Sequence, residues 1–510
     1  MKKEISGMKI FRALLSFLLV VNIIYISGCS DDPNEKANKL YTDASKEIQA
    51  SKEDNKKYSE LLVSYKNAKS RIDRILSKYP SSNIAVELLS DGTKISGLTL
   101  RQFRELELSL DTLAEAEQSP LSCAFLVAST IEGSVEKSWP LANIAVKYAN
   151  IEQFNQAMEI AKTIEATSFK SKALAEIAGT YAQAGQKDQA LKLLSQALDI
   201  VKTIEDTSSK SGGMAEIAGA YTEAGQKDQA LQILSQALDI AKTIEDTSTQ
   251  SMALADITAM YAKNEQLNQA IEIAKTIEDT STQSMALADI AAMYAKNEQL
   301  NQAIEIAKTI EATSFKSKAL AEIAGTYAEA GQKDQALKLL SQALELTESI
   351  EDASSKFWML AEIAGTYAEA GHEGQALKLL SQALDIVKTI EDTWSKSGGM
   401  AEIAGAYAEA GQKDQALQIL SQALDIAQSI ESTWAKSWKL TEIAVKYANV
   451  EQLNQALDIA KTIEDTSTQS MALAEIADIH AQGTVQLSEE DKAILFDITH
   501  SIRPMSQFWK

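Results

Sequence analysis

A tyrosine recurs at intervals of either 33 or 40 residues through most of this chain, and this recurrence constrains the fold more than any other feature. The series consists of Tyr148, Tyr181, Tyr221, Tyr261, Tyr294, Tyr327, Tyr367, Tyr407 and Tyr447, and His480 takes the next position. A period in this range is typical of solenoids, in which each repeat packs only on its neighbours. Such stacking allows a chain of 510 residues to fold without a single oversized core.

Each repeat predicts two helices. Between Leu174 and Tyr181, apolar residues recur at offsets of three, four and seven, which places them on one helical face. Gly185 predicts the end of this helix, because glycine adopts the left-handed conformation of a C-terminal cap without strain. A second apolar face then runs from Ala190 to Ile204. Two helices joined by a tight turn are therefore expected in every repeat.

The longer repeats carry seven additional residues in the second helix. At about 100° per residue, seven residues turn through about 700°, which falls only about 20° short of two full turns. The apolar face therefore keeps its direction while the helix grows by about 10 Å. Shorter repeats replace Ala-Gly at the turn with Asn-Glu, as at Asn264-Glu265 and Asn297-Glu298. Both lengths are expected to stack in one array.

This pattern resembles the tetratricopeptide repeat family over residues 114–484. The residues that carry the resemblance are Leu174, Ile177-Ala178, Tyr181, Gly185, Ala190, Leu194 and Ala197-Leu198. The resemblance implies an all-α, right-handed superhelical solenoid of antiparallel helix pairs that binds peptides or proteins on its concave side. The array departs from the family in lacking the proline that usually closes the second helix, since no proline lies between Pro140 and Pro504.

The N-terminus predicts export and lipid anchoring. Residues 1–28 combine a basic end with an apolar stretch that is too short for an ordinary membrane span, which is typical of a signal peptide. Ile26-Ser27-Gly28-Cys29 resembles a bacterial lipoprotein cleavage box, which implies acylation of Cys29. Ser30 after this cysteine favours the outer membrane where the envelope has two membranes. An ordinary secreted protein and an uncleaved anchor are the alternatives.

Less regular segments flank the repeats. Residues 29–39 are polar and predict a tether, and residues 40–113 predict an irregular helical region with a degenerate helix pair near 58–79. Within that region, Asp91-Gly92 favours a helix end over a hairpin, and Thr99 predicts an N-terminal cap. Residues 485–510 are expected to form a C-terminal capping helix and tail, because the last repeat of a solenoid needs a cover.

Composition and spacing argue against catalysis. The net charge of −22 disfavours nucleic-acid partners, and the three histidines show no metal-ligand spacing. We find no catalytic set, so the sequence predicts no enzyme, no cofactor, no metal and no small-molecule substrate. Cys123 is expected to be an unreactive thiol.

A variable position suggests where a partner binds. The residue nine before each tyrosine lies about 180° from it around the first helix, opposite the packing face. It changes widely between repeats, and its apolar members are expected to line a concave groove: Trp139, Met252, Met285, Trp358, Trp438 and Met471. Packing against the preceding repeat is the alternative. Trp394 and Trp434 are expected to pack between repeats, and small residues two before the tyrosine predict a tightly curled inner wall.

These features predict a membrane-anchored, extracytoplasmic lipoprotein of the bacterial envelope that serves as a protein-binding scaffold. Two alternatives remain open: a structural spacer or assembly factor without a peptide groove, and a non-catalytic accessory to a cell-wall or polysaccharide enzyme.

Overall fold

The computed structural model describes residues 32–52, 56–483 and 486–504, and within these ranges the chain is helical, with no strand beyond an isolated bridge between Ile95 and Leu98. The predicted signal peptide and Cys29 lie outside the described residues. None of the helices in the described part combines the length and apolarity needed to cross a membrane. The chain divides into an N-terminal unit, residues 1–117 with 503–510, and a ring unit, residues 118–502.

The N-terminal unit contains α2 (Pro33–Ala50), α3 (Tyr58–Lys78), α4 (Asn83–Leu89) and α5 (Leu100–Ala116). Helix α3 packs against both α2 and α5, and the rings of Tyr65 and Phe103 meet in its core with centroids 4.8 Å apart. The buried carboxylate of Glu117 accepts a hydrogen bond of 2.8 Å from the Tyr58 backbone N–H. Glu117 thus satisfies an amide that the start of a helix leaves without a partner.

Three expectations for this region meet different outcomes. Residues 33–39, expected to be a tether, are helical, because Asp32 caps α2 and Pro33 suits its first turn. The degenerate pair expected near 58–79 is instead the single helix α3, whose partner is α2. The predicted helix end is confirmed at Asp91, which has φ 56°, and Thr99 caps α5 in a full capping box.

The ring unit is built from pairs of a first and a second helix. Every first helix is 17 residues long: α7 (Ser134–Asn150), α9 (Thr167–Gln183), α11 (Thr207–Glu223), α13 (Thr247–Lys263), α15 (Thr280–Lys296), α17 (Thr313–Glu329), α19 (Ala353–Glu369), α21 (Thr393–Glu409), α23 (Thr433–Asn449) and α25 (Thr466–Gln482). The second helices have 8 to 10 residues in the short repeats: α8 (Phe154–Thr163), α14 (Leu267–Ala274), α16 (Leu300–Thr309) and α24 (Leu453–Thr462). They have 15 to 17 residues in the long repeats: α10 (Lys187–Lys202), α12 (Lys227–Ala241), α18 (Lys333–Glu348), α20 (Glu373–Thr389) and α22 (Lys413–Gln428). The predicted lengthening of the second helix is confirmed.

The turn between the two helices follows the chemistry that the sequence indicates. Long repeats place a glycine there with φ between 74° and 84°, as at Gly185. Short repeats place a glutamate in the same left-handed conformation, with φ between 60° and 63°, as at Glu298. A side chain strains this conformation by about 1–2 kcal/mol, which the packing of the two flanking helices must offset.

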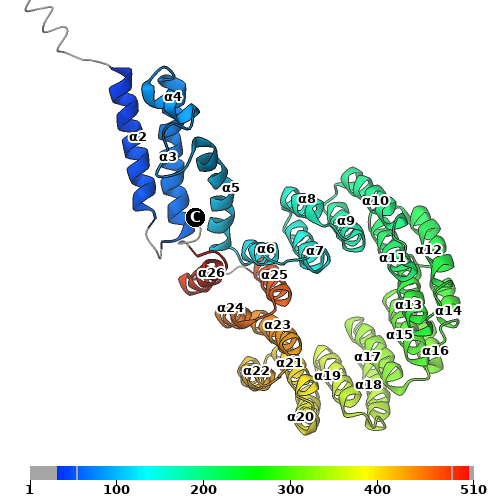
Figure 1. The fold of residues 1–510 in the computed structure, drawn as a ribbon. Helices are drawn as coiled ribbons and strands as arrows, with labels where there is room; N and C mark the ends of the chain where they lie inside the picture. Colours follow the sequence, from blue (N-terminus) through cyan, green and yellow to red (C-terminus); the bar gives the residue numbers. More distant parts are fainter. Residues whose placement is uncertain (1–31, 53–55, 484–485, 505–510) are drawn as a thin grey trace, which may run out of the picture. The chain divides into compact units, whose positions relative to one another are not determined.

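The two ends of the array meet. Helix α6 (Pro120–Ser129) packs alongside α25 in the position that a second helix holds beside its first helix elsewhere, and α25 also packs on α7 (Figure 1). Ten helix pairs therefore close into a ring in the described part of the chain, and the tenth pair joins two segments that are far apart in sequence. Helix α26 (Glu489–Ile502) covers α24 and α6.

The chain forms the predicted all-α solenoid, but ring closure corrects the expectation that its last repeat has an exposed end. The apolar face of α6 provides the cover, since Leu121, Cys123 and Val127 are 4%, 0% and 0% exposed. Helix α26 does form, and Ser488 and Asp491 cap it reciprocally, with a hydrogen bond of 2.7 Å from the Ser488 N–H to the Asp491 carboxylate. Helix α26 therefore covers the junction between the first and last repeats, and it does not cap an exposed last repeat.

Candidate binding surface of the ring

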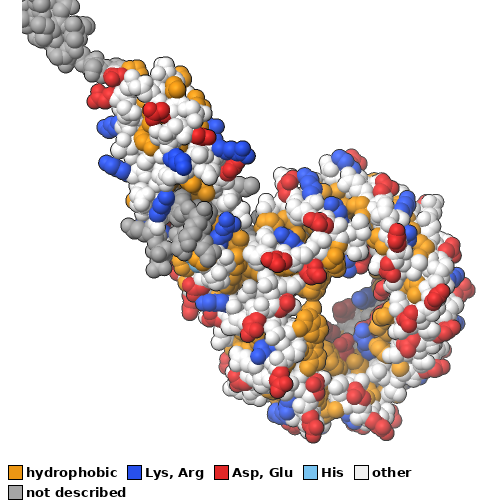
Figure 2. Space-filling model, viewed as in Figure 1, with side chains coloured by type: hydrophobic (Ala, Val, Ile, Leu, Met, Phe, Trp, Pro, Cys, Tyr) orange, Lys and Arg blue, Asp and Glu red, His pale blue; other side chains and the backbone are white. Residues whose placement is uncertain are grey.

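The first helices form the inner wall of the ring, and the second helices lie outside them (Figure 1). Two contacts between neighbouring first helices join residues at equal offsets from the repeated tyrosine, and others join offsets about one helical turn apart, such as Lys172 with Glu216. Lys263 and Glu223, each two after its tyrosine, form an ion pair of 2.6 Å, and Trp394 and Trp434, each thirteen before, stack with centroids 6.1 Å apart. The first helices therefore run parallel and in register, so equal offsets mark levels around the wall. Figure 2 shows the hollow that this wall surrounds.

The predicted groove residues lie at one level of this wall in two separate groups. Trp139 and Trp438 lie on the two helices that flank α25, and their rings meet with centroids 5.7 Å apart. Met471, on α25 between them, is half-buried. This group lies where the two ends of the repeat array meet, so its side chains take part in packing.

The second group is open to solvent. Met252 is 53% exposed and Met285 is 36% exposed on the neighbouring helices α13 and α15. Trp358 on α19 is 46% exposed, and its ring stacks on the buried Phe357 with centroids 5.7 Å apart. These three side chains are rigidly mounted on helices and have free apolar surface.

A tryptophan cluster continues from the first group toward the N-terminal ends of α21 and α23. Trp434 stacks on Trp394 and meets Trp438 edge-on with centroids 6.1 Å apart, so Trp394 and Trp434 pack between repeats as expected. Trp434 nevertheless remains 61% exposed. The Lys439 ammonium lies 4.2 Å from the centroid of the Trp394 ring, a cation–π contact, over the space that Gly398 leaves free.

A carboxylate recurs on the inner wall five residues before the tyrosine, and the sequence analysis overlooked it. Its members are Glu176, Glu216, Asp256, Asp289, Glu322, Glu362, Glu402, Glu442 and Glu475, with Asn143 in the first repeat. Burial raises the pKa of Glu176, Asp256, Asp289 and Glu322 above the ordinary values. The fixed offset was visible in the sequence, but the fold was needed to show that these carboxylates share one surface.

Clefts on the inner wall open between the first helices. One of 740 Å³ runs from α13 to α19, with Met260 and Met293 among its apolar residues and Glu362 and Glu369 among its acidic ones. A second cleft of 390 Å³ lies between α19 and α21, with Leu380 of α20 also in its lining, and shares Glu369. Together they offer an extended hollow with an apolar floor and an acidic border.

Comparison with known proteins agrees with this architecture. A family profile described as tetratricopeptide repeat matches residues 317–389. The repeats are tetratricopeptide-like. The presence of repeats of this kind supports a role as a scaffold for protein–protein interactions. No curated protein matches the chain.

Several solved structures resemble the tetratricopeptide-like array. Ton1535 from Thermococcus onnurineus NA1 is 19% identical over 73% of this chain and 96% of its own, with a TM-score of 0.26. The nearly identical TPR-like repeats of a putative kinesin light chain from Podosopora anserina are 24% identical over 45% of this chain and 100% of their own, with a TM-score of 0.24. A Rap protein complexed with Competence and Sporulation Factor is 14% identical over 66% of this chain and 99% of its own, with a TM-score of 0.27.

The junction that closes the tetratricopeptide-like ring combines the apolar contact of α6 with α25 and a polar contact of α7 with α25. The Lys147 ammonium on α7 donates hydrogen bonds of 2.9 Å to both Glu475 and Asp478 on α25. Burial opposes the charge on Lys147, but the hydrogen bonds to these two carboxylates outweigh it and raise the pKa of Lys147. Among the described residues, the Asn143 Oδ1 and His480 Nε2 atoms buried there have no hydrogen-bond partner. The buried polar atoms of this junction are therefore less completely hydrogen-bonded than those between consecutive repeats.

Cys123 belongs to the same junction and is fully buried in α6. Burial raises the pKa of its thiol to about 12, so the thiolate that reacts with electrophiles is rare at neutral pH. Within the described ranges, no three His, Cys, Asp or Glu side chains are grouped so as to bind a metal ion.

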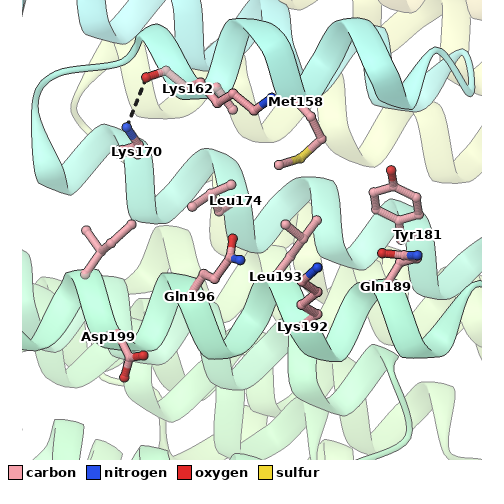
Figure 3. Close-up of a pocket in the computed structure, with 12 residues that line it drawn as sticks. Met158, Lys162, Lys170, Leu174, Tyr181, Gln189, Lys192, Leu193, Gln196 and Asp199 are labelled. Carbon is pink, nitrogen blue, oxygen red and sulfur yellow. Dashed lines mark hydrogen bonds between the residues drawn. The ribbon is translucent and has the colours of Figure 1, made fainter.

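An outer cleft of 510 Å³ lies where the short helix α8 meets the long helix α10 across α9 (Figure 3). Met158, Leu174 and Leu193 provide apolar lining, and Tyr181 stacks on Phe154 with centroids 3.9 Å apart. The Lys170 ammonium donates to the carbonyl of Lys162 and caps the end of α8. The outer cleft follows from the difference in repeat length, which the sequence shows without indicating a hollow.

Proposed function

We propose that this chain is a non-catalytic protein-binding scaffold, carried on the outer side of a bacterial membrane by an acylated Cys29, and that its partner binds on the inner wall of the ring. The proposal excludes a catalytic role and a nucleic-acid partner. The anchor is proposed from the signal peptide and cleavage box of the sequence, and it places the ring in the cell envelope, at the outer membrane where there is one.

One observation carries the binding role. Met252, Met285 and Trp358 expose large apolar surfaces on the inner wall, at a position that varies widely between otherwise similar repeats. Exposed apolar groups that gather on a soluble surface commonly mark an interaction site. Tryptophan and methionine are suited to this use, because one offers a large rigid contact area and the other adapts to its partner.

A crosslinking pull-down from envelope extracts tests the proposal. The binding variant combines Met252→Ala with Trp358→Ala, which removes exposed side chains and leaves the core intact. The matched control combines Val63→Ala with Leu89→Ala, because these residues of the N-terminal unit are 61% and 66% exposed. We expect a discrete partner that is captured by the wild type and the control but lost by the binding variant.

Equal capture by all three proteins would reject the inner wall as the binding surface and favour the structural spacer. The anchor has its own test: metabolic labelling with a palmitate analogue should mark the wild-type chain and leave Cys29→Ala unlabelled.

One feature favours a second candidate, a non-catalytic accessory to a polysaccharide enzyme. Trp434 offers an exposed indole held firmly by its stack on Trp394, and flat aromatic surfaces of this kind bind sugar rings. Binding of purified cell-wall glycan by the wild type and its loss in Trp434→Ala would establish that function in place of the scaffold.

A further inference from the structure

Three consecutive first helices present the same inward-facing stripe. In α17, α19 and α21, the positions five before, two before and two after the tyrosine hold glutamate, glycine and glutamate. These offsets differ by three and seven residues, so each stripe lies along one helical face. The acidic groove consists of these nine residues: Glu322, Gly325, Glu329, Glu362, Gly365, Glu369, Glu402, Gly405 and Glu409.

Gly325 and Gly365 form an open floor, whereas the Lys446 side chain lies against Gly405, with Nζ 3.3 Å from where a Cβ would stand. A Cβ placed on Gly365 would meet nothing within 4 Å, and one on Gly325 would meet only ordinary contacts at 3.6 Å. Gly325 lines the cleft of 740 Å³, Gly365 lines the cleft of 390 Å³, and both clefts are lined by Glu369. An extended chain can therefore approach the helix backbone closely between the two rows of glutamates.

The acidic groove contains more glutamate carboxylates than lysine side chains that pair with them. Lys318 pairs with Glu322 at 3.5 Å, and Lys446 of the next helix pairs with Glu402 at 2.7 Å. Four carboxylates form no ion pair with any described residue: Glu329, Glu362, Glu369 and Glu409. Burial and the neighbouring glutamates raise the pKa of Glu369 above its usual value. A cation that enters the groove would relieve this repulsion.

The inner wall already holds one cation in a site of the same chemistry. Lys439 is only 9% exposed, and its ammonium lies 4.2 Å from the Trp394 ring and 2.6 Å from the Glu442 carboxylate. The acidic groove has the same two components, because Trp358 lies one helical turn before Glu362 on the same face and is 46% exposed. Lys318 on α17 interacts with Glu362 as well as with Glu322, but among the described residues no cation–π contact covers the Trp358 ring.

We infer that the acidic groove binds an extended, lysine- or arginine-bearing segment of the partner protein, with its cationic side chains paired with Glu362 and Glu369 and one of them stacked on Trp358. The inference rests on the proposed function and adds the charge of the partner to it. Charge complementarity decides the occupant: an acidic segment would meet uncompensated carboxylates, whereas a guanidinium or ammonium group finds both a carboxylate and an indole face.

Fluorescence anisotropy with a labelled decapeptide of alternating arginine and glycine tests this inference. The groove variant combines Glu362→Gln with Glu369→Gln. The matched control combines Glu345→Gln with Asp425→Asn, which changes the net charge equally on exposed outer helices. We expect the groove variant to bind about tenfold more weakly than the wild type, the control to stay within about twofold, and the affinity of the wild type to fall as salt is added.

Equal weakening in the groove variant and the control would overturn the inference, because attraction would then come from total charge alone. Unchanged binding by the groove variant would also overturn it. The pull-down separates this failure from failure of the proposed function. A partner that is retained by the groove variant but lost by the Met252→Ala, Trp358→Ala variant leaves the scaffold standing without the cationic segment. A partner retained by both variants removes the proposed function itself.

Discussion

Placing a charge in α6 should open the ring locally. Val127 is fully buried in this helix, which holds the first and last repeats together. Val127→Asp would bury a carboxylate without a partner, which costs about 3–5 kcal/mol. The side chains of Leu121, Leu126 and Val127 contribute at most roughly 5–9 kcal/mol to closure, at about 1.5–3 kcal/mol for each fully buried side chain. The substitution therefore removes a large part of what holds the junction.

Because each repeat packs only on its neighbours, opening should remain confined to the junction. Cys123 reports on it directly: its thiol is buried with a pKa of about 12 in the closed ring and becomes reactive when α6 leaves α25. We expect rapid alkylation of Cys123 in Val127→Asp, with faster amide exchange in α6, α7 and α25 and unchanged protection in α13 to α17.

Ser129→Asp is the matched control, since it adds the same charge to an exposed position of the same helix. It should leave Cys123 protected from alkylation. Protected Cys123 in Val127→Asp would show that α6 does not hold the ring closed. Loss of protection throughout α13 to α17 would refute nearest-neighbour stability, because the whole ring would then unfold as one.

Three further predictions concern the repeats. Glu298→Gly should stabilise α15 and α16 by about 0.5–1 kcal/mol in native-state hydrogen exchange, since glycine removes the strain of the left-handed turn; a loss of protection would contradict this. Gly399→Ala should destabilise α21 by about 1–3 kcal/mol, because the new Cβ would lie 2.7 Å from Phe357. Gly365→Ala should instead stabilise α19 by about 1 kcal/mol, because alanine favours helix and the new Cβ would meet nothing within 4 Å. Urea denaturation of the two variants compares these changes, and equal effects would contradict the packing argument. Burial and the neighbouring carboxylates raise the folded-state pKa of Glu369 above 4.5, so its favourable contribution to stability is complete below that pH and is lost as the pH rises through the raised value. Glu369→Gln should therefore raise the Tm more at about pH 7.5 than at about pH 4, and a larger gain at the lower pH would refute the sign.

Local features of the fold could be predicted because they depend on residues close together in the chain. The period of the tyrosines indicates paired helices, glycine or Asn-Glu marks each turn, and Thr99 indicates a helix start that the structure confirms. The binding surface was predictable only in part. The offset of nine residues identified Met252 and Trp358, which are exposed on the inner wall, but it also selected Trp139 and Trp438, which pack against each other. The recurring carboxylate was passed over, because one repeat viewed alone shows a solvated helix face.

By itself, the sequence determined that the chain forms stacked helix pairs of two lengths, since helix faces and turns arise from interactions within a few residues. Only the tertiary structure decided that the array closes. Closure pairs α6 with α25 across more than 300 residues of sequence, and it depends on the small rotation between neighbouring repeats summing to one full turn. No local pattern records that sum, because an error of a few degrees in each repeat would leave the ends apart.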